Sequence, residues 1–186
     1  MDRASDYGSE GWGFESLRAR SSPRFEWWFA CAVIAAVAWW PLLHLDRIPV
    51  LWTIDLGFHE LGHLIGYVTR LPELVTAVAG NGLQTLAPLL AAGVAAYRRR
   101  WALAAAALAW AGGTLIDASN YIADAPYERL ELLGGDHDWA FALGPGRLDA
   151  LSAVPTIVSV LRVAAWVLVV AAVVVLAVSR RVGSDR

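Results

Sequence analysis

The chain has 186 residues, of which 58% are hydrophobic and 17% charged, with a formal net charge of −2. Soluble domains contain about 45–50% apolar residues, so this composition excludes a soluble enzyme, a disordered chain and a nucleic-acid-binding module. Four stretches lack Asp, Glu, Lys and Arg, at residues 27–45, 74–97, 101–116 and 163–179. About 20 apolar residues cross a bilayer as a helix, so the sequence predicts a multi-pass integral membrane protein surrounded by lipid.

Two polar tails are expected to flank the membrane domain. Residues 1–24 are rich in Ser, Gly and charged residues and predict a mobile tail, and residues 181–186 form a second polar tail. The intervening residues 25–180 are then one transmembrane metal-site domain. Its spans are expected, in chain order, at residues 27–43, 50–69, 74–97, 101–123 and 154–179. The expected fold is an all-α transmembrane bundle of about five spans.

The third apolar block contains residues that disfavour a straight helix. Gly80, Asn81 and Gly82 interrupt it, and Pro88 follows them. Irregular backbone at membrane depth occurs where protein or a wet cavity satisfies its polar groups. The sequence therefore admits a short re-entrant segment in this block, followed by a helix.

The arginines give conflicting indications of membrane orientation. Basic residues flanking a span favour the cytoplasmic side. The N-terminus is placed on that side by Arg18, Arg20 and Arg24. With five spans, the opposite orientation is indicated by Arg98–Arg100 and by Arg180 and Arg181. A re-entrant segment within 70–97 would reconcile the two, and the sequence leaves the orientation open.

The second span contains the string Phe58-His59-Glu60-Leu61-Gly62-His63. Two histidines four residues apart project from one helix face, so both imidazoles can reach one Zn²⁺. Glu60 lies between them, close enough to activate a metal-bound water. Ionisable side chains within a span are costly unless they are paired, wetted or metal-bound. The string predicts a zinc site, and the alternative is a metal-free polar cluster used for helix packing.

The same face of the second span carries Asp55, Gly62 and Gly66. The two glycines are four residues apart and allow another helix to approach closely. Asp55 lies one turn before His59 and is placed to orient an imidazole from behind. We therefore expect the ligand face to be the close-packing face as well.

A catalytic zinc site needs a third protein ligand and an open position for water. The favoured third ligand is His137, in the string Gly-Gly-Asp-His-Asp-Trp. Its neighbours Asp136 and Asp138 are alternatives, because either can bind the metal or fix the tautomer of the imidazole. The remaining interpretation of these residues is a solvated loop turn.

The second half of the fourth span carries a polar stripe with helical spacing, formed by Asp117, Asn120, Tyr121 and Asp124. Carboxylates are costly against lipid, so we expect this face to point into the bundle and toward the histidines. Asp117 lies deeper in the span than Asp124 and is the favoured functional residue of this stripe, and Asn120 and Tyr121 are candidate substrate contacts. In the third block, Asn81 and Gln84 can offer amides to a substrate or an oxyanion, or cap a broken helix.

These strings together resemble a known class of membrane enzyme. The chain is similar to the zinc metalloproteases of the site-2 protease class (peptidase family M50), and more closely to small bacterial membrane proteins related to them. The similarity covers roughly residues 55–141 and is carried by FHELGH, GNGLQTLAP (80–88), DASNYIADA (117–125) and LLGGDHDW (132–139). It implies His59 and His63 as zinc ligands and Glu60 as the base. In that class the third ligand is an Asp on a later span, for which Asp117 is the positional counterpart.

The leading expectation is a zinc-dependent intramembrane hydrolase, specifically a metallopeptidase in the bacterial cytoplasmic membrane that cleaves a transmembrane peptide. A lipid amidase or esterase would use the same chemistry. A non-catalytic metal-binding protein is the alternative from another class. Three protein ligands with water beside Glu60 would favour hydrolysis, whereas a closed site of four protein ligands would favour a structural role.

Overall fold

The computed structural model describes residues 23–132 and 135–184 of the chain. The regular elements in these ranges are all helical: α1 (Pro23–Val37), the π-helical turn η2 (Ala38–Leu43), α2 (Pro49–Val68), α3 (Glu73–Tyr97), α4 (Trp101–Asp124), α5 (Asp138–Leu143), the 3₁₀ turn η3 (Leu151–Ala153) and α6 (Val154–Ser184). The expected all-α fold is confirmed. The expected tail at 1–24 lies outside the described residues except for its last two positions, and α6 extends into the expected tail at 181–186.

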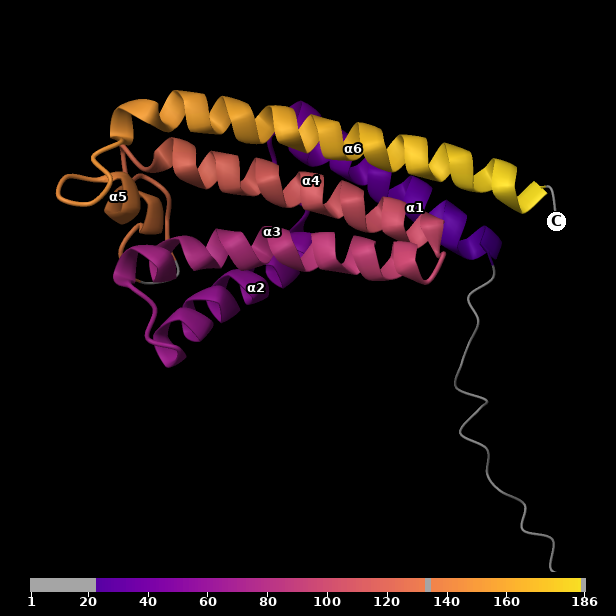
Figure 1. The fold of residues 1–186 in the computed structure, drawn as a ribbon. Helices are drawn as coiled ribbons and strands as arrows, with labels where there is room; N and C mark the ends of the chain where they lie inside the picture. Colours follow the sequence, from indigo (N-terminus) through magenta and orange to yellow (C-terminus); the bar gives the residue numbers. More distant parts are fainter. Residues whose placement is uncertain (1–22, 133–134, 185–186) are drawn as a thin grey trace, which may run out of the picture.

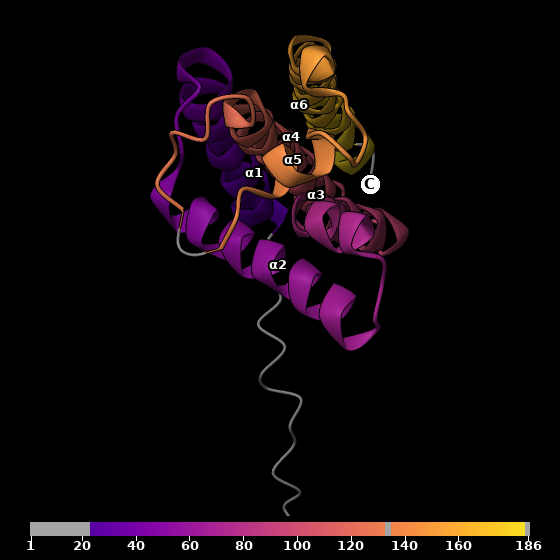
Figure 2. The same cartoon turned by 90° about the vertical axis from the view of Figure 1, so that its left-hand side faces the viewer.

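Four helical segments are long and apolar enough to cross a membrane: Arg24–Leu43, Glu73–Tyr97, Trp101–Asp124 and Leu151–Ser179. The chain is therefore an integral membrane protein. Helix α2 has 20 residues and begins and ends one residue before the expected span, but it is not one of these four. Its histidines and carboxylates lower its mean hydropathy. It lies obliquely across one face of the bundle, against α3 (Figure 1, Figure 2).

Helix α3 is continuous from Glu73 to Tyr97, which corrects the expected re-entrant segment. Gly80 lies inside the continuous helix, and its missing side chain makes room for the two imidazoles of α2. The side chain of Asn81 is hydrogen-bonded to Gln84 one turn along, so it does not compete for the helix backbone. Pro88 is fully buried inside the helix, which continues past it for two more turns.

The contact between α2 and α3 depends on two glycines, as expected from their spacing. A Cβ on Gly62 would collide with the backbone of Ala79, and one on Gly66 would lie 2.7 Å from side-chain atoms of Thr76. The expected close-packing face of α2 is thereby confirmed. The close approach also places the histidine face of α2 directly over α3.

A second close contact joins α4 to α6 and forms the apolar core. Gly112 of α4 lies against Val169 and Ala165 of α6. The surrounding cluster consists mainly of small and branched apolar residues from three helices, including Ala30, Val37, Ala105, Ala109, Ile116 and Ala172. This core supports the polar site but contributes no side chain to it.

Candidate metal centre

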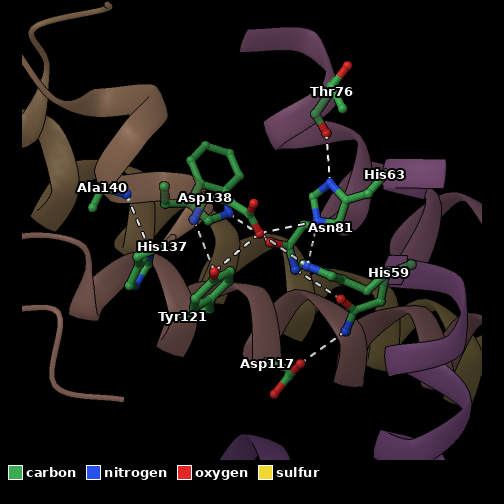
Figure 3. Close-up of polar contacts among 11 residues, drawn as sticks. His59, His63, Thr76, Asn81, Asp117, Tyr121, His137, Asp138 and Ala140 are labelled. Atoms are coloured by element: carbon green, nitrogen blue, oxygen red, sulfur yellow. Dashed lines mark hydrogen bonds and ion pairs between the residues drawn. The ribbon is translucent and has the colours of Figure 1, made fainter. Parts of the chain in front are cut away.

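Two histidines of α2 and an aspartate of α5 converge on one point (Figure 3). The Nε2 atoms of His59 and His63 are 3.0 Å apart. Oδ2 of Asp138 lies 3.2 Å from Nε2 of His59 and 3.3 Å from Nε2 of His63. Residues 79 positions apart in sequence thus bring three potential ligand atoms together.

The spacing of these three atoms fits a metal ion. Zinc binds nitrogen and oxygen ligands at about 2.0–2.1 Å in tetrahedral geometry, which separates neighbouring ligand atoms by about 3.3–3.4 Å. The observed separations of 3.0–3.3 Å are close to this value. Two imidazole nitrogens and one carboxylate oxygen are also a donor set that zinc accepts in catalytic sites.

The tautomer of His63 is fixed by a backbone carbonyl. Nδ1 of His63 lies 2.9 Å from the carbonyl oxygen of Thr76, which can only accept a hydrogen bond. Nδ1 therefore carries the proton, and in the neutral ring Nε2 keeps its lone pair. That lone pair faces the Asp138 carboxylate, and a cation between the two would relieve their repulsion. A ligand histidine held by a carbonyl at its other nitrogen is usual in metal sites.

Tyr121 of α4 holds Asp138 in place. The backbone N–H of Asp138 donates to the Tyr121 hydroxyl over 3.1 Å, and this hydroxyl donates to Oδ2 of Asp138 over 3.2 Å. Burial disfavours the ionised carboxylate. When no metal is bound and the imidazoles are protonated, their hydrogen bonds and positive charge outweigh this cost and keep the pKa of Asp138 below its ordinary value. Asp138 is therefore ionised at neutral pH.

His137, the third ligand favoured by the sequence, does not join this cluster. Its ring is 2% exposed and stacks on Tyr121 at a centroid distance of 4.2 Å. Its Nδ1 accepts from the backbone N–H of Ala140 over 3.3 Å and so caps α5 (Figure 3). Its Nε2 is buried 3.6 Å from a carboxylate oxygen of Asp124. Burial lowers the pKa of His137. The third side chain in the cluster is Asp138, whereas the sequence favoured His137.

Gly80 of α3 forms the wall behind the two imidazoles. A Cβ at this position would lie 2.7 Å from Nε2 of His63 and 2.8 Å from Nε2 of His59. These distances are too short for any side chain, so glycine is required for the histidines to point where they do. The glycine that interrupts the apolar pattern in the sequence is therefore part of the site.

The three ligand atoms face a cavity of about 530 Å³. This volume is in the range of small-molecule sites. Most of the residues that the sequence singled out line it: Glu60, Asn81, Gln84, Asp117, Tyr121 and Asp136. The expected inward orientation of the polar stripe on α4 is thus met at Asp117 and Tyr121.

A chain of hydrogen bonds crosses the cavity wall. The indole N–H of Trp139 donates to Asn81 over 2.7 Å, Asn81 donates to Gln84 over 2.9 Å, and Gln84 donates to Asp117 over 3.0 Å. Arg47 donates to the other oxygen of Asp117 over 2.8 Å. Asp117 is therefore engaged by an amide and a guanidinium, and it is not in the ligand cluster.

Two further candidates lie outside the lining of this cavity. Asp55 is buried and accepts a 2.7 Å hydrogen bond from the indole of Trp110, so it does not orient a histidine. Asn120 donates to the carbonyl of Leu45 and accepts from Arg162. Both therefore connect helices or their linkers and have no contact with the ligand cluster.

Sequence reasoning missed three groups that shape the site. The carbonyl of Thr76 carries no signal, because every residue has one. Trp139 ends the GGDHDW string, and its indole ties α5 to α3. Arg47 lies in the short connection before α2, and its place opposite Asp117 is a long-range contact.

No family model matches this chain, and no curated protein or solved structure matches it.

Proposed function

We propose that this protein is a zinc-dependent membrane hydrolase that cleaves peptide bonds, similar in chemistry to the M50 peptidases and set in a bacterial cytoplasmic membrane. The observation that supports a catalytic site is the number of ligands. Within the described residues, the group that can hold a metal contains three side chains, His59, His63 and Asp138. Three protein ligands leave a coordination position for water or substrate, whereas structural zinc sites are closed by four.

Each residue of the site has a distinct task in this proposal. His59, His63 and Asp138 hold the zinc, and Tyr121 and the Thr76 carbonyl orient two of these ligands. Bound zinc would polarise a substrate carbonyl and acidify a water. Glu60 lines the same cavity and is the base that takes the proton of the attacking water and delivers it to the leaving amine.

The amides on α3 are suited to hold a peptide. Each side-chain amide of Asn81 and Gln84 has two N–H groups, and each uses one of them within the hydrogen-bond chain. Both residues line the cavity, and in this proposal the second N–H of each is the donor to a carbonyl oxygen of the substrate. Their partners in the chain fix both amides in place, which makes them pre-organised donors.

The ligand set is tested by metal content of the detergent-purified protein with a matched pair of variants. We expect about one zinc per chain in wild type. Asp138→Asn keeps the size of the side chain but removes its charge, and we expect this variant to bind no zinc. His137→Asn keeps an acceptor for the N–H of Ala140, and we expect it to retain zinc. Loss of zinc in His137→Asn, with retention in Asp138→Asn, would identify His137 as the third ligand. Wild type that binds no zinc after reconstitution contradicts the proposal.

The hydrolase is tested with fluorescence-quenched peptides that each contain one apolar span, reconstituted with the protein in liposomes. Glu60→Gln is expected to keep its zinc and to lose cleavage by about 10²–10⁴-fold, the usual contribution of a general base. Glu128→Gln, an exposed loop change, is the control and should cleave at the wild-type rate. Equal cleavage by Glu60→Gln and wild type would exclude Glu60 as the base. Bound zinc without cleavage of any peptide would favour a non-catalytic metal protein.

A further inference from the structure

The start of α1, the turn between α3 and α4, and the end of α6 lie at one end of the bundle (Figure 1). An ion pair between Glu26 and Arg100 joins the first two. Helices α4 and α6 are antiparallel, since Gly112 lies against Ala165 and Arg162 donates to Ser119. The end of α6 therefore returns to the start of α4.

Helices α1 and α2 run in the same direction, one after the other. Helix α1 is parallel to α4, because Glu26 pairs with Arg100 and Val37 lies against Gly113. Helix α2 is antiparallel to α3, which is itself antiparallel to α4 (Figure 1). The chain therefore keeps its direction from α1 to α2, and its first reversal of direction is between α2 and α3.

This arrangement removes the conflict among the arginines. The end that holds the start of α1 carries the basic residues nearest to the spans, namely Arg24, Arg98, Arg99 and Arg100, with Arg180 and Arg181 following the last span in sequence. The opposite end has three arginines in its connections, Arg70, Arg129 and Arg147. They lie among seven acidic residues, which are Glu73, Asp124, Glu128, Glu131, Asp136, Asp138 and Asp149. An excess of Lys and Arg in short connections marks the cytoplasmic side. All three arginine groups now indicate the same side.

The metal centre lies toward the other end of the bundle. Gly80, which backs the two imidazoles, is separated from the last residue of α3, Tyr97, by about 26 Å of helix at 1.5 Å per residue. The hydrocarbon core of a bilayer is about 30 Å thick. The ligands therefore lie near the boundary opposite the arginines, and α5, which supplies Asp138, belongs to the connection at that end.

We propose that the metal centre opens on the non-cytoplasmic side of the membrane, and that its substrate is a peptide segment presented at that surface, next to a span. The assignment of a peptide substrate rests on the proposed function, whereas the sidedness rests on the arginines and the helix directions alone. The cavity is lined there by residues of the α4–α6 connection, including Leu130, Leu132 and Asp136. A bond near the boundary of the bilayer is also within reach of water, which hydrolysis consumes.

Sidedness is tested by cysteine labelling in intact cells that express the full chain. Cys31→Ser removes the single native cysteine. Two exposed tyrosines outside the site serve as reporters: Tyr127, 63% exposed in the α4–α6 connection, and Tyr97, 89% exposed at the end of α3. We expect a membrane-impermeant maleimide to label Tyr127→Cys before permeabilisation and Tyr97→Cys only after it.

Labelling of Tyr97→Cys in intact cells with protection of Tyr127→Cys would overturn the proposal, and so would labelling of both in intact cells. The assay needs neither metal nor activity, so its failure is distinguishable from failure of the proposed function. Zinc-bound protein with reversed labelling contradicts the sidedness alone. Metal-free protein with the expected labelling contradicts the proposed function alone and leaves the sidedness supported.

Discussion

Two helix contacts in this protein are both made possible by glycines, but they have different consequences. The α4–α6 contact and the α2–α3 contact both depend on glycines that bring helix backbones close together. Around Gly112, the residues of α6 that face α4 include Ala165 and Val169, and the contact belongs to an apolar core. Between α2 and α3, the facing residues include His59, His63 and the carbonyl of Thr76, and the contact produces a polar cluster.

The difference shows what close approach does in a membrane bundle. Lipid tails are as apolar as the helix surfaces, so small residues stabilise a contact mainly through van der Waals packing. Around Gly112 in the α4–α6 contact, this packing is the whole result. In the α2–α3 contact the glycines also set the positions of two imidazoles, so the same substitution should damage stability in one contact and metal binding in the other.

The largest expected effect is that of Gly80→Ala on zinc affinity. Its Cβ would lie 2.7–2.8 Å from imidazole atoms and would push both histidines out of place. We expect at least a 100-fold loss of affinity, beyond the 10–100-fold typical of changes behind the ligands, measured by competition with a chromogenic zinc chelator. Gly82→Ala is the control, because a Cβ there meets no atom within 4 Å. Equal affinity in both variants would show that α3 does not position the ligands.

Gly112→Ala is the matching change in the α4–α6 contact. Its Cβ would lie 2.9 Å from Val169 and 3.0 Å from the carbonyl of Ala165. Overpacking should outweigh the better helix propensity of alanine and destabilise the protein by about 1–2 kcal/mol, seen as a lower Tm in detergent. Zinc affinity should not change. Gly93→Ala, which has open space around it, should keep or raise the Tm.

Tyr121→Phe separates the orientation of Asp138 from the packing of the site. The change removes the hydroxyl that bonds Asp138 twice but keeps the ring that stacks on His137. Zinc affinity should fall about tenfold, the lower end for groups that orient a ligand. The Tm of the metal-free protein should stay close to wild type. Unchanged affinity would mean that α5 alone holds Asp138, and Tyr127→Phe on the exposed loop is the control.

The smallest effect is expected for Asp55→Asn. The sequence placed Asp55 as a partner of His59, but its carboxylate accepts from Trp110 instead. An asparagine can accept the same hydrogen bond, so zinc affinity should stay within about twofold of wild type. A loss of zinc affinity comparable to that of Tyr121→Phe would show that Asp55 contributes to the metal site.

Much of the fold follows from local patterns in the chain. The bounds of α2, α3 and α4 agree with the expected spans to within a few residues, because long apolar runs and their polar ends are local features. The histidine pair and the Gly62–Gly66 pair were also readable, since the helical repeat alone places each pair on one face. The helix break expected at Gly80 does not occur. A glycine in an apolar run can mark either the end of a helix or a position where another group packs against the backbone, and the sequence does not distinguish the two.

The sequence by itself determined an all-helical membrane protein with two histidines and a glutamate on one helix. Only the tertiary structure decided between His137 and Asp138, which are adjacent in sequence. Side chains of neighbouring residues point in different directions, and the one that meets the histidines is set by how α5 docks through Trp139 and Tyr121. The directions of α1 and α2 were likewise decided by contacts between distant residues, such as Glu26 with Arg100, which no local pattern encodes.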